Sequence, residues 1–139
     1  MTTIAYRDGI LAADTMMSAN DMRSGSAIKI MRHGRLIIGF AGRLANFEAF
    51  RDWLGAGMKG KFRSENGNVF IIPPHGPAIV WGDGDTPWRE TAPFWALGSG
   101  EGPALGAMAA GATAEEAVRA AIELDVWSGG EITVLGREC

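Results

Sequence analysis

The stretch TTIAYRDGILAAD, residues 2–14, decides how the chain begins to fold. Two short apolar runs, TTIAYR and ILAAD, stand on either side of the dipeptide Asp8-Gly9. Asp-Gly favours the two-residue turns with positive φ that join antiparallel strands. The sequence therefore predicts a β-hairpin over residues 2–14, with Thr2 at its start and Asp14 at its end.

Further strands and helices are predicted along the rest of the chain. Strand pairs are expected at 27–32 with 35–42 and at 69–73 with 78–82, and single strands at 94–98 and 131–136. Apolar spacing predicts helices over 44–57 and 103–111, and Thr113 with Glu116 forms a capping box that opens a helix over 113–125. Residues 15–27, 58–68 and 82–92 are expected to be loops.

These elements predict an α+β fold with a single domain over residues 1–139. Several predicted strands are apolar on both faces, and such strands need cover on both sides of their sheet. We therefore expect a four-layer αββα sandwich, in which two antiparallel sheets lie between layers of helices. The pattern alone leaves an α+β barrel open as the alternative.

Composition argues against several classes of protein. The chain has 13 basic and 16 acidic residues, a net charge of −3, and no basic stripe that would indicate nucleic-acid binding. No apolar run approaches the roughly 18 residues of a membrane span, and the N-terminus has no secretory pattern. The single cysteine, Cys139, cannot form an internal disulfide, which is typical of a cytoplasmic protein.

Most known catalytic patterns are also missing from the sequence. His33 and His75 each stand beside a turn glycine, which argues against a Ser-His-Asp triad. No Cys/His cluster has the spacing of zinc ligands, so we expect no metal and no other cofactor. The glycine-rich segment GSGEG at 98–102 lacks the Lys-Ser/Thr of a phosphate-binding loop.

Thr2 is the residue whose chemistry remains open. An N-terminal threonine supplies a nucleophilic hydroxyl and, in its own α-amine, a base with a reference pKa of about 7.7–8.0. Lys29 lies in an apolar strand between Ile28 and Ile30. A strand lysine usually faces solvent, but one that faces inward needs a carboxylate partner, and Asp14 offers one.

Six segments in register then resemble the proteasome β-subunits and the bacterial peptidase HslV, which are N-terminal-nucleophile hydrolases. The segments are TTI (2–4), AAD (12–14), KI (29–30), GFAG (39–42), LGSG (97–100) and DVWSGG (125–130). The resemblance covers nearly the whole chain and implies the αββα fold of that family. It also implies a threonine peptidase that works within a ring of like subunits.

The resemblance assigns a role to each matching residue. It implies that Thr2 is the nucleophile, that Lys29 assists it electrostatically, that Asp14 holds the lysine, and that the Gly42 N–H stabilises the oxyanion. Its other implied site residues are Ser99, Asp125 and Ser128, which orient the threonine amine, and Met17, Phe40 and Leu44, which shape the substrate pocket.

The chain also departs from the family pattern. It is shorter than typical members, and only about ten residues separate the first predicted helix from the next strand, where the family usually has a second helix. The spacing from Asp14 to Lys29 is shorter as well. Only Met1 precedes Thr2, as in HslV, and the chemistry requires its removal, because Thr2 otherwise has no free α-amine.

The family implies peptide or unfolded-protein substrates and a homo-oligomeric ring. By analogy with HslV, an ATPase that the sequence does not identify could feed the ring, and a particle that works without such a partner fits equally well. Two alternative functions stay open at this point. The chain could be a non-catalytic subunit that keeps the fold as a scaffold, or an N-terminal-nucleophile amidohydrolase that acts on a small amide, since the fold does not fix the substrate.

Overall fold

The computed structural model of the chain describes residues 2–19 and 22–137. The helices within these ranges are α1 (Leu44–Gly55), α2 (Glu101–Ala109) and α3 (Ala114–Leu124). The strands are β1 (Thr3–Arg7), β2 (Ile10–Ala13), β3 (Met16–Ala19), β4 (Met22–Ser26), β5 (Ile30–His33), β6 (Leu36–Gly42), β7 (Gly67–Ile72), β8 (Ala78–Trp81), β9 (Trp88–Glu90), β10 (Phe94–Gly98) and β11 (Thr133–Gly136).

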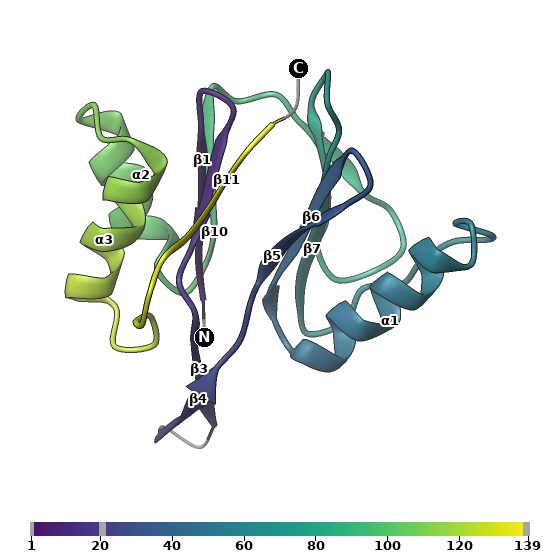
Figure 1. The fold of residues 1–139 in the computed structure, drawn as a ribbon, viewed down its shortest axis with the longest axis horizontal. Helices are drawn as coiled ribbons and strands as arrows, with labels where there is room; N and C mark the ends of the chain where they lie inside the picture. Colours follow the sequence, from purple (N-terminus) through teal and green to yellow (C-terminus); the bar gives the residue numbers. More distant parts are fainter. Residues whose placement is uncertain (1, 20–21, 138–139) are drawn as a thin grey trace.

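The strands form two larger antiparallel sheets (Figure 1). One sheet has the order β10-β1-β2-β11 and the other the order β5-β6-β7-β8-β9. The hairpins predicted at Asp8-Gly9, at His33-Gly34 and before Ala78 are confirmed, because β1 pairs with β2, β5 with β6, and β7 with β8. The α+β class is therefore confirmed, with antiparallel sheets and helices on their flanks.

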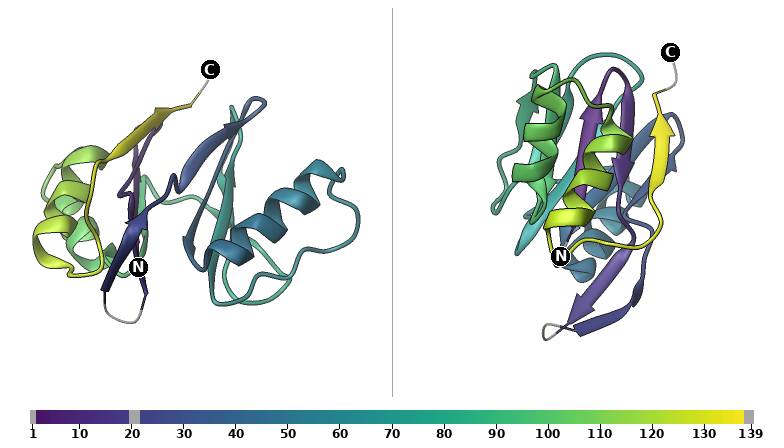
Figure 2. Two further views of the ribbon diagram at one scale, coloured as in Figure 1. Left: turned by 60° about the horizontal axis from the view of Figure 1, so that its bottom comes forward. Right: turned by 90° about the vertical axis from the view of Figure 1, so that its left-hand side faces the viewer.

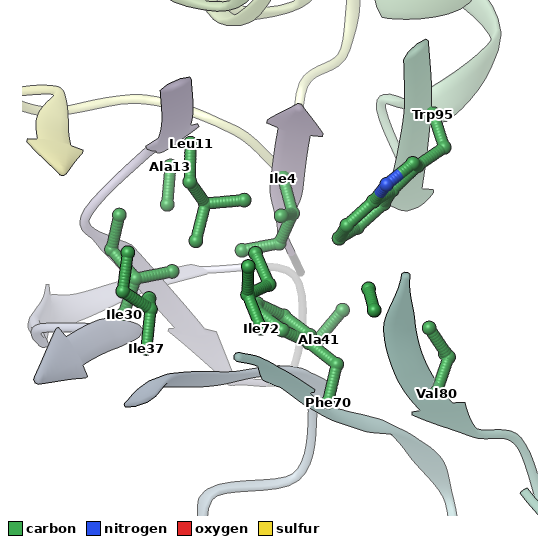
Figure 3. Packing of buried hydrophobic residues seen from close by; sticks show 11 residues of the cluster. Ile4, Leu11, Ala13, Ile30, Ile37, Ala41, Phe70, Ile72, Val80 and Trp95 are labelled. Carbon is green, nitrogen blue, oxygen red and sulfur yellow. The ribbon is translucent and has the colours of Figure 1, made fainter. Parts of the chain in front are cut away.

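A hydrophobic cluster fills the space between the two sheets (Figure 3). Ile4, Leu11 and Trp95 enter it from the first sheet, while Ile37 and Phe70 enter it from the second. All five side chains are buried. Because successive strand residues point to opposite faces, each sheet keeps its other face for the helices.

The helices cover these outer faces, as Figures 1 and 2 show from three directions. On the first sheet, α2 and α3 bury Met108 and Val118 against Ala5 and Ala12. On the second, α1 buries Phe47 in a cluster that includes Ile38 and Val69. The capping box predicted at Thr113 is confirmed at the start of α3.

Three of the predicted loops contain structure that the sequence did not reveal. Residues 15–27 include the β3–β4 hairpin, which extends below the sheets in Figure 1, and residues 82–92 include β9. All five residues of β4 are exposed, so the strand has no alternation of apolar and polar residues to indicate it. Within 58–68, Phe62 and Ser64 are buried.

The short connection from α1 to β7 is one departure from the family pattern that the structure describes directly. Residues 56–66 make this connection without forming a helix. In the described parts of the chain, no helix is long and apolar enough to cross a membrane.

Candidate active site

The site begins where β1 begins, and the register of the first hairpin builds it. Ile4 pairs with Ala13, so the residue after β2 falls beside Thr3. The Asp14 N–H donates to the Thr3 carbonyl at 3.2 Å, and the Thr3 N–H donates to Asp14 Oδ1 at 3.0 Å. Thr2 is 2% exposed and Asp14 is 0% exposed, so this end of the hairpin is an interior position.

Lys29 completes a buried ion pair at the same place. Its Nζ lies 2.8 Å from Asp14 Oδ1, and both side chains are 0% exposed. The same ammonium donates to the Met16 carbonyl at 2.7 Å. Because Asp14 Oδ1 also accepts the Thr3 N–H, one oxygen joins the lysine to the peptide group that links Thr2 to Thr3. The inward orientation that the sequence left open for Lys29 is therefore the one found.

Burial and pairing act on Lys29 in opposite directions. Burial disfavours the charged form and lowers the pKa of Lys29 below its ordinary value, while the Asp14 carboxylate partly offsets this effect. The carboxylate itself is well satisfied, since Asp14 Oδ2 accepts the Gly129 N–H at 3.0 Å. The pair is thus held in one fixed geometry by the backbone of two distant segments.

A second polar group lies on the other side of the same strand end. Ser99 Oγ accepts the Thr2 N–H at 3.2 Å and donates to Asp125 Oδ2 at 2.6 Å. Ser128 Oγ donates to the same carboxylate oxygen at 2.6 Å and lies 2.6 Å from Thr3 Oγ1. Two serines on different segments therefore donate to the same Asp125 carboxylate oxygen, close to the Thr2 nitrogen.

Hydrogen bonding keeps the Asp125 carboxylate ionised. Burial raises the pKa of Asp125, but the hydrogen bonds from the Ser128 and Ser99 hydroxyls and from the Trp127 N–H lower it by more, so the pKa of Asp125 lies below its ordinary value. An ionised carboxylate at this position fixes the direction of both hydroxyl protons. Each serine then presents its oxygen lone pairs toward the first residues of β1.

Two glycines allow these segments to come close. A Cβ on Gly98 would overlap the Thr2 carbonyl, and a Cβ on Gly100 would overlap Thr3 Oγ1. The Gly100 N–H donates to the Thr2 carbonyl at 3.3 Å. No role was predicted for Gly98, Gly100 or Thr3, although the segment G-S-G at the end of a predicted strand was the available signal.

The direction of the Gly42 N–H follows from strand geometry. The Phe40 N–H donates toward β5, to the Lys29 carbonyl at 3.1 Å, whereas the Arg43 N–H donates to the Asn66 carbonyl on the opposite side at 3.3 Å. Since N–H groups alternate sides along a strand, the Gly42 N–H faces the β5 side, beyond the point where Lys29 ends the pairing. It thus points toward the side on which Lys29 lies.

A cavity of about 440 Å³ opens beside Gly42. Its lining residues are Met17, Ser18, Gly42, Arg43, Leu44, Ala45 and Asn66. Met17 and Leu44, two of the three residues that the resemblance assigns to a substrate pocket, line this cavity. Phe40 does not line this cavity, because its side chain points to the other face of β6 and stacks on Phe47 under α1 at 4.6 Å. Arg43 and Asn66 are lining residues that the sequence analysis did not name.

The described residues include no group of three or more His, Cys, Asp or Glu side chains placed to hold a metal ion. Cys139, like Met1, lies outside the described residues. Around Thr2 the described residues contribute the hydroxyl groups of Ser99 and Ser128, the Lys29 ammonium group and the carboxylates of Asp14 and Asp125.

Comparison with known proteins identifies the fold. No family model matches the chain, and no curated protein matches it in sequence. Among solved structures, Thiobacillus denitrificans BPH is 23% identical with a TM-score of 0.72, and the match covers 99% of this chain and 97% of that chain. The same protein in complex with epoxomicin is 22% identical over the same shares of the two chains, with a TM-score of 0.68.

Eukaryotic HslV from Trypanosoma brucei is 19% identical, with a TM-score of 0.72, and the match covers 99% of both chains. At these levels of identity the similarity concerns the fold. The chain thus shares, over nearly its full length, the fold of the proteasome-like N-terminal-nucleophile hydrolases that its sequence segments resemble.

Proposed function

We propose that the chain is an N-terminal threonine peptidase in which the Thr2 hydroxyl, once Met1 has been removed, attacks peptide bonds. One observation carries this proposal. In the fully buried Asp14–Lys29 pair, the Asp14 oxygen that binds the lysine also accepts the N–H of the peptide group between Thr2 and Thr3. The fold that the chain shares with BPH and HslV supports the same conclusion.

The pair is hard to explain by stability alone. Taking two charges out of water costs several kcal/mol per ion, and well-packed apolar residues of similar volume would often stabilise a fold as much or more. A positive charge at 0% exposure, bound to the carboxylate oxygen that also accepts the Thr3 N–H, has a clear chemical use. It lowers the pKa of a nearby amine and favours the negative charge that develops on a reacting oxygen.

In the first step, Thr2 Oγ forms a bond to the carbonyl carbon of the substrate, and its proton passes to the free α-amine of Thr2. The carbonyl oxygen becomes an oxyanion, which the Gly42 N–H stabilises. The C–N bond of the substrate then breaks, and the leaving amine takes the proton from the α-ammonium. The product of this step is an acyl ester on Thr2.

In the second step, a water molecule attacks the ester and gives its proton to the α-amine. The tetrahedral intermediate collapses, and the proton returns to Thr2 Oγ as the ester bond breaks. Throughout both steps, Ser99 and Ser128 orient the amine, and the Asp125 carboxylate holds the two serines. Asp14 keeps Lys29 in place.

We also propose the arrangement in which the site works. The sheets and their flanking helices form the αββα sandwich of the family, and copies of the chain form a ring that encloses the sites. An ATPase that feeds unfolded protein into such a ring is the partner this arrangement calls for. Light scattering tests the ring, since a monodisperse 14.8 kDa species would exclude it.

The decisive experiment for the activity uses protein whose intact mass shows that it starts at Thr2. We expect this preparation to hydrolyse fluorogenic peptides, Thr2→Ser to retain part of the activity, and Thr2→Ala to have none. Protein that still carries Met1 provides a matched control with the same fold. If Thr2→Ala hydrolyses peptides as fast as the unaltered protein, the proposal is wrong.

A further inference from the structure

We propose that Asp83 is a positioning residue for the oxyanion site, and that it acts by holding a turn of residues 64–67 against Gly42. This inference rests on the proposed function, in which the Gly42 N–H stabilises the oxyanion. Asp83 lies in the loop after β8, far from Thr2 in sequence, and neither the sequence motifs nor the resemblance gave it a role.

The first step is the contact between the turn and Gly42. A Cβ built on Gly42 would lie 2.5 Å from the Asn66 carbonyl oxygen and 2.7 Å from Gly67 Cα. Gly42 has φ of +125° and Gly67 has φ of +152°, so the two glycines pack backbone against backbone. No side chain lies between them, and any shift of the turn would therefore move the Gly42 peptide group directly.

The second step is the bond that fixes the turn. Asp83 Oδ1 accepts the Asn66 N–H at 2.7 Å, and the Gly67 N–H lies 3.4 Å from the same oxygen. Asn66 has φ of +60°, a left-handed conformation with a small energetic cost for asparagine, which tolerates it better than most residues other than glycine. A charged acceptor with a short hydrogen bond offsets this cost and selects the conformation.

The third step is that the turn is also bound to the start of α1. Asn46 Nδ2 donates to Ser64 Oγ at 3.0 Å, and Asn46 Oδ1 accepts the Glu65 N–H at 2.9 Å. Ser64 is 0% exposed and exchanges two backbone hydrogen bonds with Gly84, at 2.9 and 2.8 Å. The turn thus lies clamped between the first turn of α1 and the loop that carries Asp83.

The pairing of β6 with β7 brings the turn to this place, because its register sets Gly67 opposite Gly42. Residues 56–66 connect α1 to β7 without a helix, and the end of this connection is the turn itself. The Arg43 N–H bond to the Asn66 carbonyl, at 3.3 Å, ties the residue after Gly42 to the same turn. Asp83 therefore acts on Gly42 through one rigid backbone segment.

A matched control lies two residues away. Asp85 belongs to the same loop and carries the same charge, but its side chain accepts a hydrogen bond from the neighbouring Thr86 hydroxyl, at 3.3 Å. Asp83→Ala removes the acceptor of the Asn66 N–H, whereas Asp83→Asn keeps an oxygen that can accept it. Comparing these variants with Asp85→Ala separates the hydrogen bond from the general effect of removing a negative charge.

The experiment measures kcat and KM for a fluorogenic peptide, and the affinity for a peptide aldehyde, in protein that starts at Thr2. The aldehyde forms a tetrahedral adduct and so depends on the oxyanion site, as kcat does. We expect Asp83→Ala to lower kcat and weaken aldehyde binding, each about tenfold, while KM stays within about twofold. We expect Asp83→Asn to restore most of the loss and Asp85→Ala to match the unaltered protein.

The inference is overturned if Asp83→Ala keeps the kcat and the aldehyde affinity of the unaltered protein, or if Asp85→Ala loses as much as Asp83→Ala. If Asp83→Ala does not fold, Asp83→Glu replaces it. The longer side chain keeps the charge but moves the acceptor oxygen away from the Asn66 N–H. An unchanged kcat for Asp83→Glu again overturns the inference. A lack of activity in the unaltered protein would instead refute the proposed function.

Discussion

Replacing Lys29 by methionine removes one charge from a pair in which both side chains are 0% exposed and the charged atoms are 2.8 Å apart. Methionine is unbranched like lysine and one heavy atom shorter, so the variant opens little new cavity. The Asp14 carboxylate then stays buried without its cation. Breaking a buried pair in this way costs about 3–5 kcal/mol, from a total stability on the order of 5–15 kcal/mol for a domain.

The double variant Lys29→Met with Asp14→Asn separates the structural from the catalytic effect. The asparagine keeps an oxygen for the Thr3 N–H but loses the second acceptor, which serves the Gly129 N–H. With no buried charge left unpaired, we expect the double variant to be more stable than Lys29→Met alone by at least about 1 kcal/mol. We expect its peptidase activity to remain as low as that of Lys29→Met, because the ammonium is missing from both.

Urea denaturation followed by tryptophan fluorescence gives the free energies of unfolding for the single variants and the double variant, which together form a thermodynamic cycle. Peptide hydrolysis on the same preparations gives the activity. The reasoning is refuted if Lys29→Met loses less than about 1 kcal/mol, or if the losses of the two single variants simply add. A fully active Lys29→Met protein would remove the lysine from the mechanism.

Other residues give further predictions. Hydrogen bonds hold the pKa of Asp125 below its ordinary value of 3.8. The ionised group therefore stabilises the fold above that pH, and this contribution is lost as the pH falls through the lowered pKa. In acid denaturation, Asp125→Asn will lose less of its free energy of unfolding than the unaltered protein does. Phe40→Ala will cost about 3–5 kcal/mol in urea denaturation, because Phe40 lies in the core. Met17→Ala will raise KM for apolar peptides and leave the unfolding midpoint unchanged, because Met17 lines the cavity. Arg43→Glu will lower kcat/KM for peptides with acidic side chains relative to neutral ones, because Arg43 is a charged residue of the cavity wall; equal effects on both peptides would exclude it from recognition.

Local chemistry explains why much of the fold could be predicted. Asp8-Gly9 predicts a tight turn wherever it stands between two apolar runs, and Thr113 with Glu116 caps a helix by bonds within one turn. The β3–β4 hairpin gives no such signal. Its residues are mostly polar or exposed, and the pairing shifts register between Met17 and Ser18, so only the pairing itself defines the strands.

In the site too, properties of single residues could be predicted from the sequence, whereas contacts between distant segments could not. The sequence indicates that an inward Lys29 needs a carboxylate partner, but not that Asp14 Oδ1 also binds the Thr3 N–H. Phe40 shows why a motif position is not sufficient. On β6, Phe40 shares its face with Ile38 and Ala41 shares its face with Ile37, so the alternation along this strand turns Phe40 toward α1 and away from the cavity.

The roles of Gly98 and Asp83 could not be predicted from the sequence, because each depends on the approach of a segment that is distant in sequence. Gly98 is required by the position of the Thr2 carbonyl, and Asp83 acts on a turn 16 or 17 residues earlier in the chain. Such contacts are set by how the two sheets and the loops around them pack, not by the local pattern of either partner.

The central claim is that Thr2 is the nucleophile, and mapping of a covalent adduct tests it most directly. A peptide that ends in a ketone beside an epoxide is a suitable probe, because a hydroxyl and an amine can attack these two electrophilic groups. Protein that starts at Thr2 is incubated with this peptide probe, digested and analysed by mass spectrometry. The account predicts an added mass on the peptide that begins with Thr2 and none in Thr2→Ala; an adduct on another residue, or none at all, would contradict it.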